Sequence, residues 1–321
     1  MFRWAAFLGL IGLAVATGII VWSGVGAVLD ALVKAGWGIL AVTAFHLIPL
    51  LVSAAGWRIL VPGKKRPTLA SFSYYLWVRA AVNNLMPVAR IGGEIASVRI
   101  MIADGMRKSV AIASTIVELT LSVAATFVFV ALGVLLFALR VNDHDVTTQL
   151  VWGLVLSTPL LAALIAVQRI GFFGLLSKLF RVLFRDKWAS ITGSAARLDR
   201  AVTILYRRKN KAIACALWQF VSWSLGSVEI WLALYFLGHP LPLLEAMMIE
   251  AMIVGSVSVA FAVPGALGVQ EASFMVFGVM LGLQHEEAAA LAVIRRCRDL
   301  IFYAPALILW QAQEGKRLLK L

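Results

Sequence analysis

Long apolar stretches recur along the chain, and they restrict it to a fold built from membrane-spanning helices. An α-helix needs about 20 apolar residues to cross a hydrocarbon core about 30 Å thick. Of the 321 residues, 62% are hydrophobic and only 14% are charged, as in a polytopic membrane protein. We therefore predict an all-α polytopic integral membrane protein, with a single membrane domain over residues 1–321. The six predicted transmembrane helices lie near residues 4–22, 37–57, 110–139, 150–168, 212–236 and 288–310.

Two other regions, 69–106 and 241–284, predict re-entrant helical hairpins. Each contains two shorter apolar pieces around a break that is rich in Pro and Gly. In lipid, the backbone groups freed by such a break have no water to bind, so the break must be buried in protein or line a polar cavity. We therefore expect the tips of both hairpins to lie in the interior of the protein.

Loop charges predict how the chain is threaded. The formal net charge is +13, and residues 169–211 hold eleven Lys or Arg against Asp186 and Asp199. Basic loops stay on the cytoplasmic side, so we predict both termini in the cytoplasm of a bacterium, with the protein in its cytoplasmic (inner) membrane. The two hairpins then enter from opposite faces. The segments predicted in the cytoplasm are 58–66, 107–108 and the basic loop 169–211; those predicted outside are 140–149, 238–242 and 284–287.

Part of the basic loop also fits a helix at the membrane surface. The stretch FFGLLSKLFRVLFR (172–185) is apolar nearly all round and is interrupted by Lys178, Arg181 and Arg185. Such a helix can lie in the interface of an anionic membrane. Residues 172–211 therefore either signal topology alone or also contact anionic lipids. Because this charge lies beside membrane spans, no nucleic-acid partner is predicted.

The two hairpin regions share a motif at one constant offset in residue number. PVARIGGEIAS (87–97) aligns with PGALGVQEASF (264–274) without a gap. The halves, about 1–145 and 146–321, each read as span, span, hairpin, span, and an odd number of crossings makes them inverted. Inverted repeats with broken helices are a transporter architecture. The matched positions are Pro87 with Pro264, Ala89 with Ala266, Glu94 with Glu271, Gly105 with Gly282, Ala111 with Ala288 and Ala113 with Ala290.

Charged residues recur inside the predicted membrane segments, at a cost of about 3 kcal/mol each by insertion scales. One interpretation is structural: acid–arginine pairs hold helices together, or Arg79 and Arg99 reach the membrane surface. The other is functional, because the planar fork of arginine suits a phosphate headgroup. His46 and Pro49 are interpreted as a bend and a helix contact. The charged set is Glu94, Glu118, Glu229, Glu250, Glu271 and Asp299 with Arg79, Arg90, Arg99, Arg295, Arg296 and Arg298.

Metal and cofactor chemistry find no support in the sequence. The four histidines are scattered, and Cys215 and Cys297 lie far apart without paired spacing. A nucleotide-binding motif and the constellations of a lipid enzyme are also missing, so we predict no cofactor, no metal and no catalytic residue.

The segments LMPVARIGGE (85–94) and VPGALGVQEASF (263–274) resemble the signature regions of the lysylphosphatidylglycerol synthase transmembrane family, often called flippase-like. Residues 206–211, 228–251 and 295–311 extend the resemblance, which looks most like the branch associated with hopanoid biosynthesis. Bifunctional relatives carry a soluble aminoacyl-transferase domain, but the longest soluble loop here has 43 residues. Lysyl transfer is therefore not expected. The resemblance implies motif residues at Pro87, Gly92, Gly93, Glu94, Pro264, Gly265, Gly268 and Glu271.

The leading hypothesis is a lipid translocase that moves a polar or anionic lipid, including a hopanoid or polyprenoid-linked one, through a cavity between the repeats. Movement would be passive or coupled to an ion gradient. The alternatives are a membrane enzyme that modifies a lipid headgroup and a scaffold for lipid-synthesis enzymes. The sequence predicts neither direction nor oligomeric state. The predicted substrate-binding and translocation residues are Arg79, Asn83, Asn84, Pro87, Arg90, Gly92, Gly93, Glu94, Arg99, Glu118, Glu229, Pro264, Gly265, Gly268, Glu271, Arg295, Arg296, Arg298 and Asp299.

Overall fold

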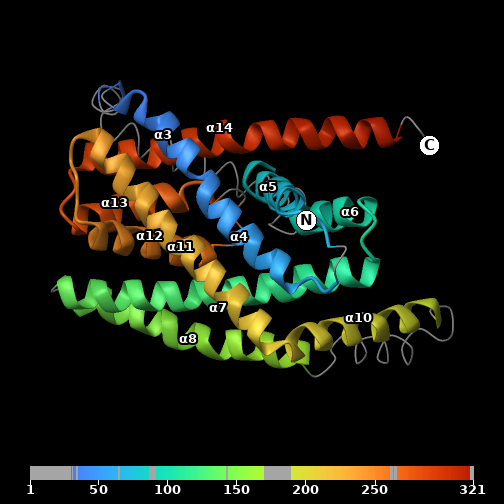
Figure 1. Ribbon diagram of the computed structural model, residues 1–321. Coiled ribbons are helices and arrows are strands. Elements are labelled where there is room, and N and C mark those ends of the chain that lie inside the picture. Colours follow the sequence, from blue (N-terminus) through green and yellow to red (C-terminus); the bar gives the residue numbers. More distant parts are fainter. Residues whose placement is uncertain are drawn as a thin grey trace.

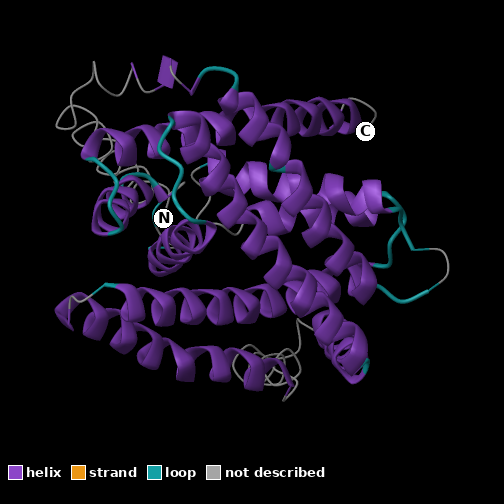
Figure 2. Cartoon of the chain, turned by 60° about the vertical axis from the view of Figure 1, so that its left-hand side comes forward, coloured by secondary structure: helices purple, strands orange, loops and turns teal. Residues whose placement is uncertain are grey.

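The computed structural model of the chain is all-helical throughout the residues that it describes (Figures 1 and 2). This confirms the predicted fold class at the level of secondary structure. The predicted span 4–22 and the predicted surface helix 172–185 lie outside the described residues. The structure describes residues 30, 32–33, 35–63, 66–86, 92–141, 144–169, 189–260, 263 and 266–318.

Four helical segments of the described chain are long and apolar enough to cross a membrane, and they confirm a multi-pass integral membrane protein. They coincide with the spans predicted near 37–57, 110–139, 150–168 and 212–236. Each reaches at least 19 residues, close to the length that a bilayer core requires. The segments are Gly38–Leu60, formed by α3 (Gly38–Phe45) and α4 (Leu47–Leu60), then α7 (Lys108–Arg140), α8 (His144–Arg169) and α11 (Lys209–Leu237).

The span predicted near 288–310 lies within α14 (His285–Leu318), which is 34 residues long. Helix α14 is not one of the four apolar segments. Its charged residues at 295–299 lower its hydropathy in the middle, although the helix is long enough to cross a bilayer. Helix α14 is therefore a long helix whose charged centre must be covered by partners.

Two pairs of shorter helices occupy the predicted hairpin regions. Helices α5 (Leu69–Leu85) and α12 (Leu243–Val259) have 17 residues each, and α6 (Gly92–Ala103) and α13 (Val269–Met280) have 12 each. At 1.5 Å per residue these lengths are about 26 and 18 Å, shorter than a bilayer core. In Figure 1 the α5–α6 pair and the α12–α13 pair lie toward opposite ends of the molecule.

The offset that aligns the two sequence motifs recurs in the positions of these elements. The first residues of α6 and α13, Gly92 and Val269, are separated by this same offset, and so are those of α7 and α14, Lys108 and His285. Helix α6 is followed by a turn at Gly105 (φ 87°), and helix α13 is followed by a turn at Gly282 (φ 98°). Residues that carry a side chain rarely adopt a positive φ, so such a turn favours glycine.

The segment 169–211 was predicted to be a basic loop, but part of it forms a helix. Helix α10 (Ala189–Arg207) packs against α7 and leads directly into α11. Val202 and Leu205 on α10 are buried. The net charge of this segment predicts a loop, but its apolar residues lie on one face of a helix, which net charge does not show.

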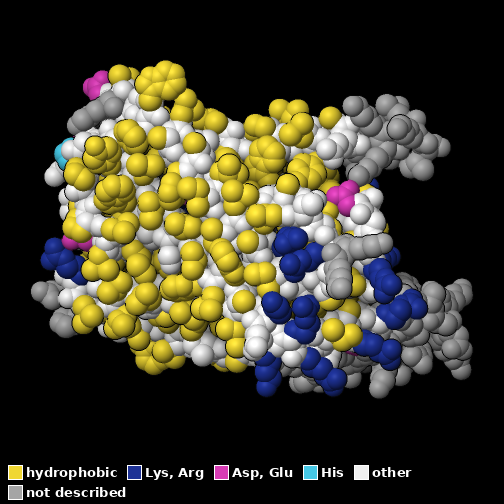
Figure 3. Space-filling view, viewed as in Figure 1, with side chains coloured by type: hydrophobic (Ala, Val, Ile, Leu, Met, Phe, Trp, Pro, Cys, Tyr) yellow, Lys and Arg dark blue, Asp and Glu magenta, His cyan; other side chains and the backbone are white. Residues whose placement is uncertain are grey.

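Most of the visible basic side chains gather at one end of the molecule, on the right in Figure 3. At this basic end, Arg208 Nη1 donates to a backbone carbonyl at the C-terminus of α4, over 3.0 Å. At the far end, Arg140 lies 3.2 Å from Glu245, and His239 lies 2.8 Å from Glu287. The segments predicted on the two sides of the membrane are thus grouped at opposite ends. Which end faces the cytoplasm stays a prediction.

The buried apolar residues form two main cores, one toward each end. The basic-end core joins α4, α5, α6 and α10 to the first parts of α7 and α11. The far-end core joins α12, α13 and the first part of α14 to the last parts of α7 and α11. Helices α7 and α11 contribute to both cores, so they tie the two ends of the molecule together.

Close packing of α7 on α12 generates a stability prediction. A Cβ at Gly133 of α7 would lie 2.2 Å from Ala251 Cβ, whereas a Cβ at Gly153 of α8 would meet nothing within 4 Å. We expect Gly133→Ala to lower the free energy of unfolding by about 1–3 kcal/mol because α7 and α12 must separate. We expect Gly153→Ala to be neutral or to stabilise by up to about 1 kcal/mol. Thermal unfolding of the two purified variants in detergent checks this, and equal shifts would contradict the packing.

Candidate functional site: a buried polar layer

Along α7 and α11, buried polar residues lie between the two apolar cores. In α7 the basic-end core reaches Val117 and the far-end core includes Phe129, and Glu118 lies between them. In α11 the corresponding core residues are Cys215 and Ile230, on either side of Gln219 and Glu229. We call the bonded set the polar layer: His46, Arg79, Glu118, Gln219, Glu229, Glu250, Arg295, Arg298, Asp299 and Tyr303.

Arg298 of α14 is the centre of the first group in this layer. Its guanidinium bonds Glu229 of α11 and its neighbour Asp299, with the Arg298 side chain only 5% exposed. Two carboxylates against one arginine would leave a negative charge, and Arg295 supplies a second cation, with Nη1 3.7 Å from Glu229 Oε2. Each of the two carboxylates thus lies against at least one arginine, as burial requires.

His46 joins this group although the sequence predicted only a bend there. A break between α3 and α4 at His46, three residues before Pro49, matches that bend. Its Nδ1 lies 2.7 Å from Glu229 and 3.2 Å from Arg298, and its Nε2 lies 2.8 Å from Tyr303. With the proton on Nδ1, the ring donates to Glu229 and accepts from the tyrosine. With the proton on Nε2, the bare Nδ1 would lie against the Glu229 carboxylate oxygen, which cannot donate, so the proton belongs on Nδ1.

Glu250 of α12 extends the polar layer toward the far end. Arg295 Nη2 donates to Glu250 Oε1 over 2.8 Å. Gly226 of α11 gives this carboxylate room, since a Cβ there would lie 2.7 Å from Glu250 Oε1. Among the described residues, Glu250 Oε2 and Ser227 Oγ have no hydrogen-bond partner although both are buried. Buried polar atoms are nearly always bonded, so these two atoms call for water or a ligand group.

The second group in the layer is centred on Glu118 of α7. Arg79 of α5 donates to both oxygens of this fully buried carboxylate. Gln219 of α11 adds a donor, with Nε2 3.0 Å from Glu118 Oε1, and Ser53 of α4 bonds Gln219 in turn. The guanidinium carbon of Arg79 also lies 4.8 Å from the ring centre of Trp57, a cation–π contact.

The glutamates of the two sequence motifs are bonded within their own helix pairs. Glu94 at the start of α6 accepts from Asn83 Nδ2 of α5 over 3.2 Å, and Asn83 Oδ1 accepts from the Gly93 amide. Glu271 at the start of α13 accepts from the Gly268 amide over 2.7 Å and from Arg296 of α14 over 2.5 Å. Each motif glutamate therefore fastens a helix start to a neighbouring segment.

Close approach explains one motif glycine. A Cβ on Gly93 would lie 2.2 Å from the Arg79 carbonyl oxygen. Gly92 is the first residue of α6, and Gly268 precedes α13 with φ 76°. Gly93 thus lets α6 start directly against α5, and Gly268 takes a backbone conformation that favours glycine.

The remaining predicted site residues divide into two groups. Asn84 bonds a backbone carbonyl of its own helix, and Arg99 lies on the exposed face of α6, away from the polar layer. The structure therefore does not bring these two into the site. The predicted residues outside the described part of the chain are Pro87, Arg90, Pro264 and Gly265.

Burial of the Arg79–Glu118 pair generates a second stability prediction. We expect Arg79→Ala to destabilise by about 3–5 kcal/mol, because it leaves the Glu118 carboxylate buried without its cation. The apolar double variant Arg79→Met with Glu118→Leu should recover most of this loss. Arg140→Ala, which breaks an exposed pair, should cost under about 1 kcal/mol. Denaturation of purified variants measures all three, and a loss for Arg79→Ala no larger than for Arg140→Ala would contradict the buried pair.

Comparison with known proteins agrees with the motifs. A family model described as "Lysylphosphatidylglycerol synthase TM region" matches residues 9–306. No curated protein and no solved structure matches the chain. The matched range includes both short helix pairs and the whole polar layer, while the resemblance to the hopanoid-associated branch stays a prediction. The chain therefore belongs to the lysylphosphatidylglycerol synthase TM region family.

Proposed function

We propose that this protein is a lipid translocase of the bacterial cytoplasmic membrane. A polar or anionic headgroup would cross through the polar layer while the lipid tails stay in the bilayer. The observation that carries the proposal is the polar layer itself, a dense set of buried charges between two apolar cores. Apolar side chains of similar size would stabilise the helices as well or better, so a purely structural role does not explain so many charges.

The distribution of ion pairs supports movement between the halves of the chain. Within the described residues, the buried arginine–carboxylate pairs join residues of the same half: Arg79 with Glu118 in the first, and Arg295, Arg296 and Arg298 with their acids in the second. A rearrangement between the halves would therefore leave these pairs intact, and avoid stranding a charge.

Most polar contacts between the halves, among the described residues, involve an uncharged partner or a backbone oxygen. Such hydrogen bonds contribute about 0.5–1.5 kcal/mol each, so they can be exchanged at moderate cost. Arg140–Glu245 is a surface exception, and His46–Glu229 involves a histidine that is neutral with its single proton on Nδ1. The other contacts between the halves among the described residues are Ser53 and Glu118 with Gln219, Pro49 with Ser222, Trp77 with Phe302, Tyr74 with Gln313, Tyr303 and Arg298 with His46, and Leu60 with Arg208.

The matching element positions support an inverted repeat with two re-entrant hairpins. Helices α6 and α13 and the glycine turns after them recur at the same offset, and the two helix pairs lie toward opposite ends. Corresponding helices also carry an ion pair with the charges exchanged: Arg79 of α5 with Glu118 of α7, and Glu250 of α12 with Arg295 of α14. Inverted halves that meet at a polar centre suit alternating access.

The arginines of the layer are suited to hold a headgroup. Arg295 Nη1 has no hydrogen-bond partner among the described residues, so it can donate to a phosphate while Arg295 keeps its pair with Glu250. Ser227 Oγ, which has no partner among the described residues either, offers a further contact, and Glu250 Oε2 can accept from a donor group of the headgroup. The resemblance suggests hopanoid or polyprenoid-linked lipids as substrates. We propose that the basic end faces the cytoplasm.

Proton coupling is a proposal that rests on His46. Its Nδ1 lies within hydrogen-bond distance of Glu229, and its Nε2 lies within hydrogen-bond distance of Tyr303. A proton taken up from water at Nε2, followed by release of the Nδ1 proton to the Glu229 carboxylate, would move one proton along the layer. Transport would otherwise be passive.

Translocation by reconstituted protein tests the proposal. Wild type should move fluorescent lipids across proteoliposome membranes, with a panel that includes phosphatidylglycerol, phosphatidylethanolamine and a polyprenyl phosphate. We expect Glu94→Gln and Glu271→Gln to lower the rate about tenfold or more, because each replaces a charge-assisted contact worth about 1.5–3 kcal/mol. Glu286→Gln, at an exposed glutamate in the first turn of α14, is the matched control and should keep the wild-type rate.

Each outcome of this assay has a distinct meaning. Wild-type rates in both motif variants, at equal reconstitution, would remove these glutamates from the mechanism. An inactive wild type that converts one lipid chemically would support the membrane-enzyme alternative. An inactive wild type without conversion would support the scaffold alternative.

A further inference from the structure

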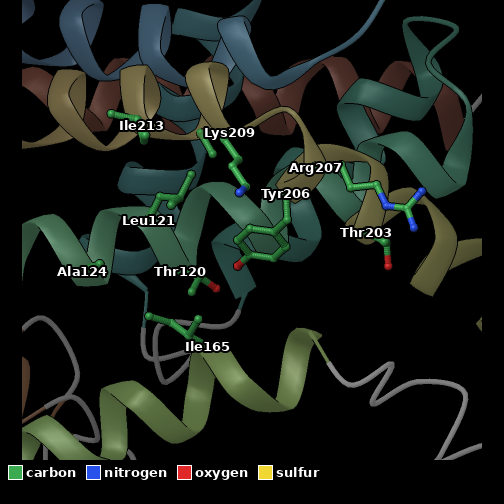
Figure 4. A pocket seen from close by; sticks show the side chains of 10 residues that line it. Thr120, Leu121, Ala124, Ile165, Thr203, Tyr206, Arg207, Lys209 and Ile213 are labelled. Atoms are coloured by element: carbon green, nitrogen blue, oxygen red, sulfur yellow. The ribbon is translucent and has the colours of Figure 1, made fainter.

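A cavity of about 500 Å³ lies between α7, α8 and the junction of α10 with α11 (Figure 4). It is separate from the polar layer and lies near the basic end. Thr120, Leu121 and Ala124 of α7 form one wall, and Ile165 of α8 forms another. The cavity is also lined by Tyr206 and Arg207 of α10 and by Lys209 and Ile213 of α11.

The junction of α10 with α11 gives this cavity a cationic rim. Arg207 and Lys209 are exposed, and neither pairs with a carboxylate in the described part of the chain. Figure 4 shows Lys209 and Tyr206 extending from this junction into the space above α8, with the tyrosine hydroxyl turned toward Thr120. In the same view the Arg207 guanidinium points away from Lys209, so the Lys209 ammonium is the cation that faces this space and can pair with a phosphate.

The rest of the cavity is apolar and opens onto the lipid-facing surface. Ile213 lines the cavity and is 59% exposed, and Leu217, one turn further along α11, is 60% exposed. Both residues lie on a helix that is long and apolar enough to cross a membrane. An acyl chain can therefore pass from the bilayer into the cavity along α11. A soluble anion would leave this apolar part unfilled.

We infer that this cavity holds one anionic phospholipid, with its phosphate at Lys209 and an acyl chain along Ile213 and Leu121. The volume suits a headgroup with the start of a chain. The site would hold a lipid at the base of α7, α8 and α11 whether or not the polar layer transports one. It therefore goes beyond the proposed function and can fail independently of it.

Binding of short-chain fluorescent lipids to the full chain in detergent tests this site. Wild type should bind phosphatidylglycerol more tightly than phosphatidylcholine, and soluble glycerol phosphate should not compete. Lys209→Ala should weaken phosphatidylglycerol binding about fivefold, as expected for one cation near an anionic headgroup. Lys211→Ala is the matched control, because Lys211 is exposed in the same basic segment and does not line the cavity.

A cavity-filling variant gives a second measurement that keeps the charges. Ala124→Phe should reduce phosphatidylglycerol binding, while Glu286→Gln, at an exposed glutamate that does not line the cavity, leaves it unchanged. Equal losses for Lys209→Ala and Lys211→Ala would overturn the proposal in favour of diffuse surface charge. Full competition by glycerol phosphate would overturn it in favour of a soluble anion, and equal affinity for the two lipids would reduce the site to an apolar groove.

Discussion

Charge compensation in the polar layer is the interaction on which the rest of the structure depends. Glu118, Glu229, Glu250 and Asp299 are all buried, and each lies against an arginine. Alone, each charge would cost several kcal/mol in an apolar interior, and paired it fixes the position of its helix. The pairs hold α5 against α7, α12 against α14 and α11 against α14. The two apolar cores can then pack on either side of a layer that is not apolar at all.

The sequence predicted those properties that depend on local composition. Hydropathy located the four apolar spans, because the length of an apolar run and the thickness of a bilayer are directly comparable. The charged set at 295–299 was found because charges stand out in an apolar helix. The constant offset between the two motifs also predicted where the short helices and the Gly105 and Gly282 turns recur. These features can be read from residues that are near one another in the chain.

The bonding partners could not be predicted in the same way, because they come from distant parts of the chain. His46 contacts Glu229 across 183 positions, and Ser53 contacts Gln219 across 166. A histidine in an apolar span requires a partner, and that requirement was the available signal for His46. Helix α10 was missed because its charge obscured its apolar stripe. Arg99 was included because its exposed position on α6 cannot be read from its residue type.

The most direct test asks whether the polar layer opens to water, as a translocation pathway must. Ser227 and Ala233 of α11 are equally buried, each 3% exposed, but Ala233 belongs to the far-end core and Ser227 does not. In a background without Cys215 and Cys297, each position is replaced by cysteine, and labelling by a small water-soluble thiol reagent is measured in proteoliposomes. The account predicts labelling of Ser227→Cys and none of Ala233→Cys. Equal protection of both would contradict it and make the polar layer a static element of packing.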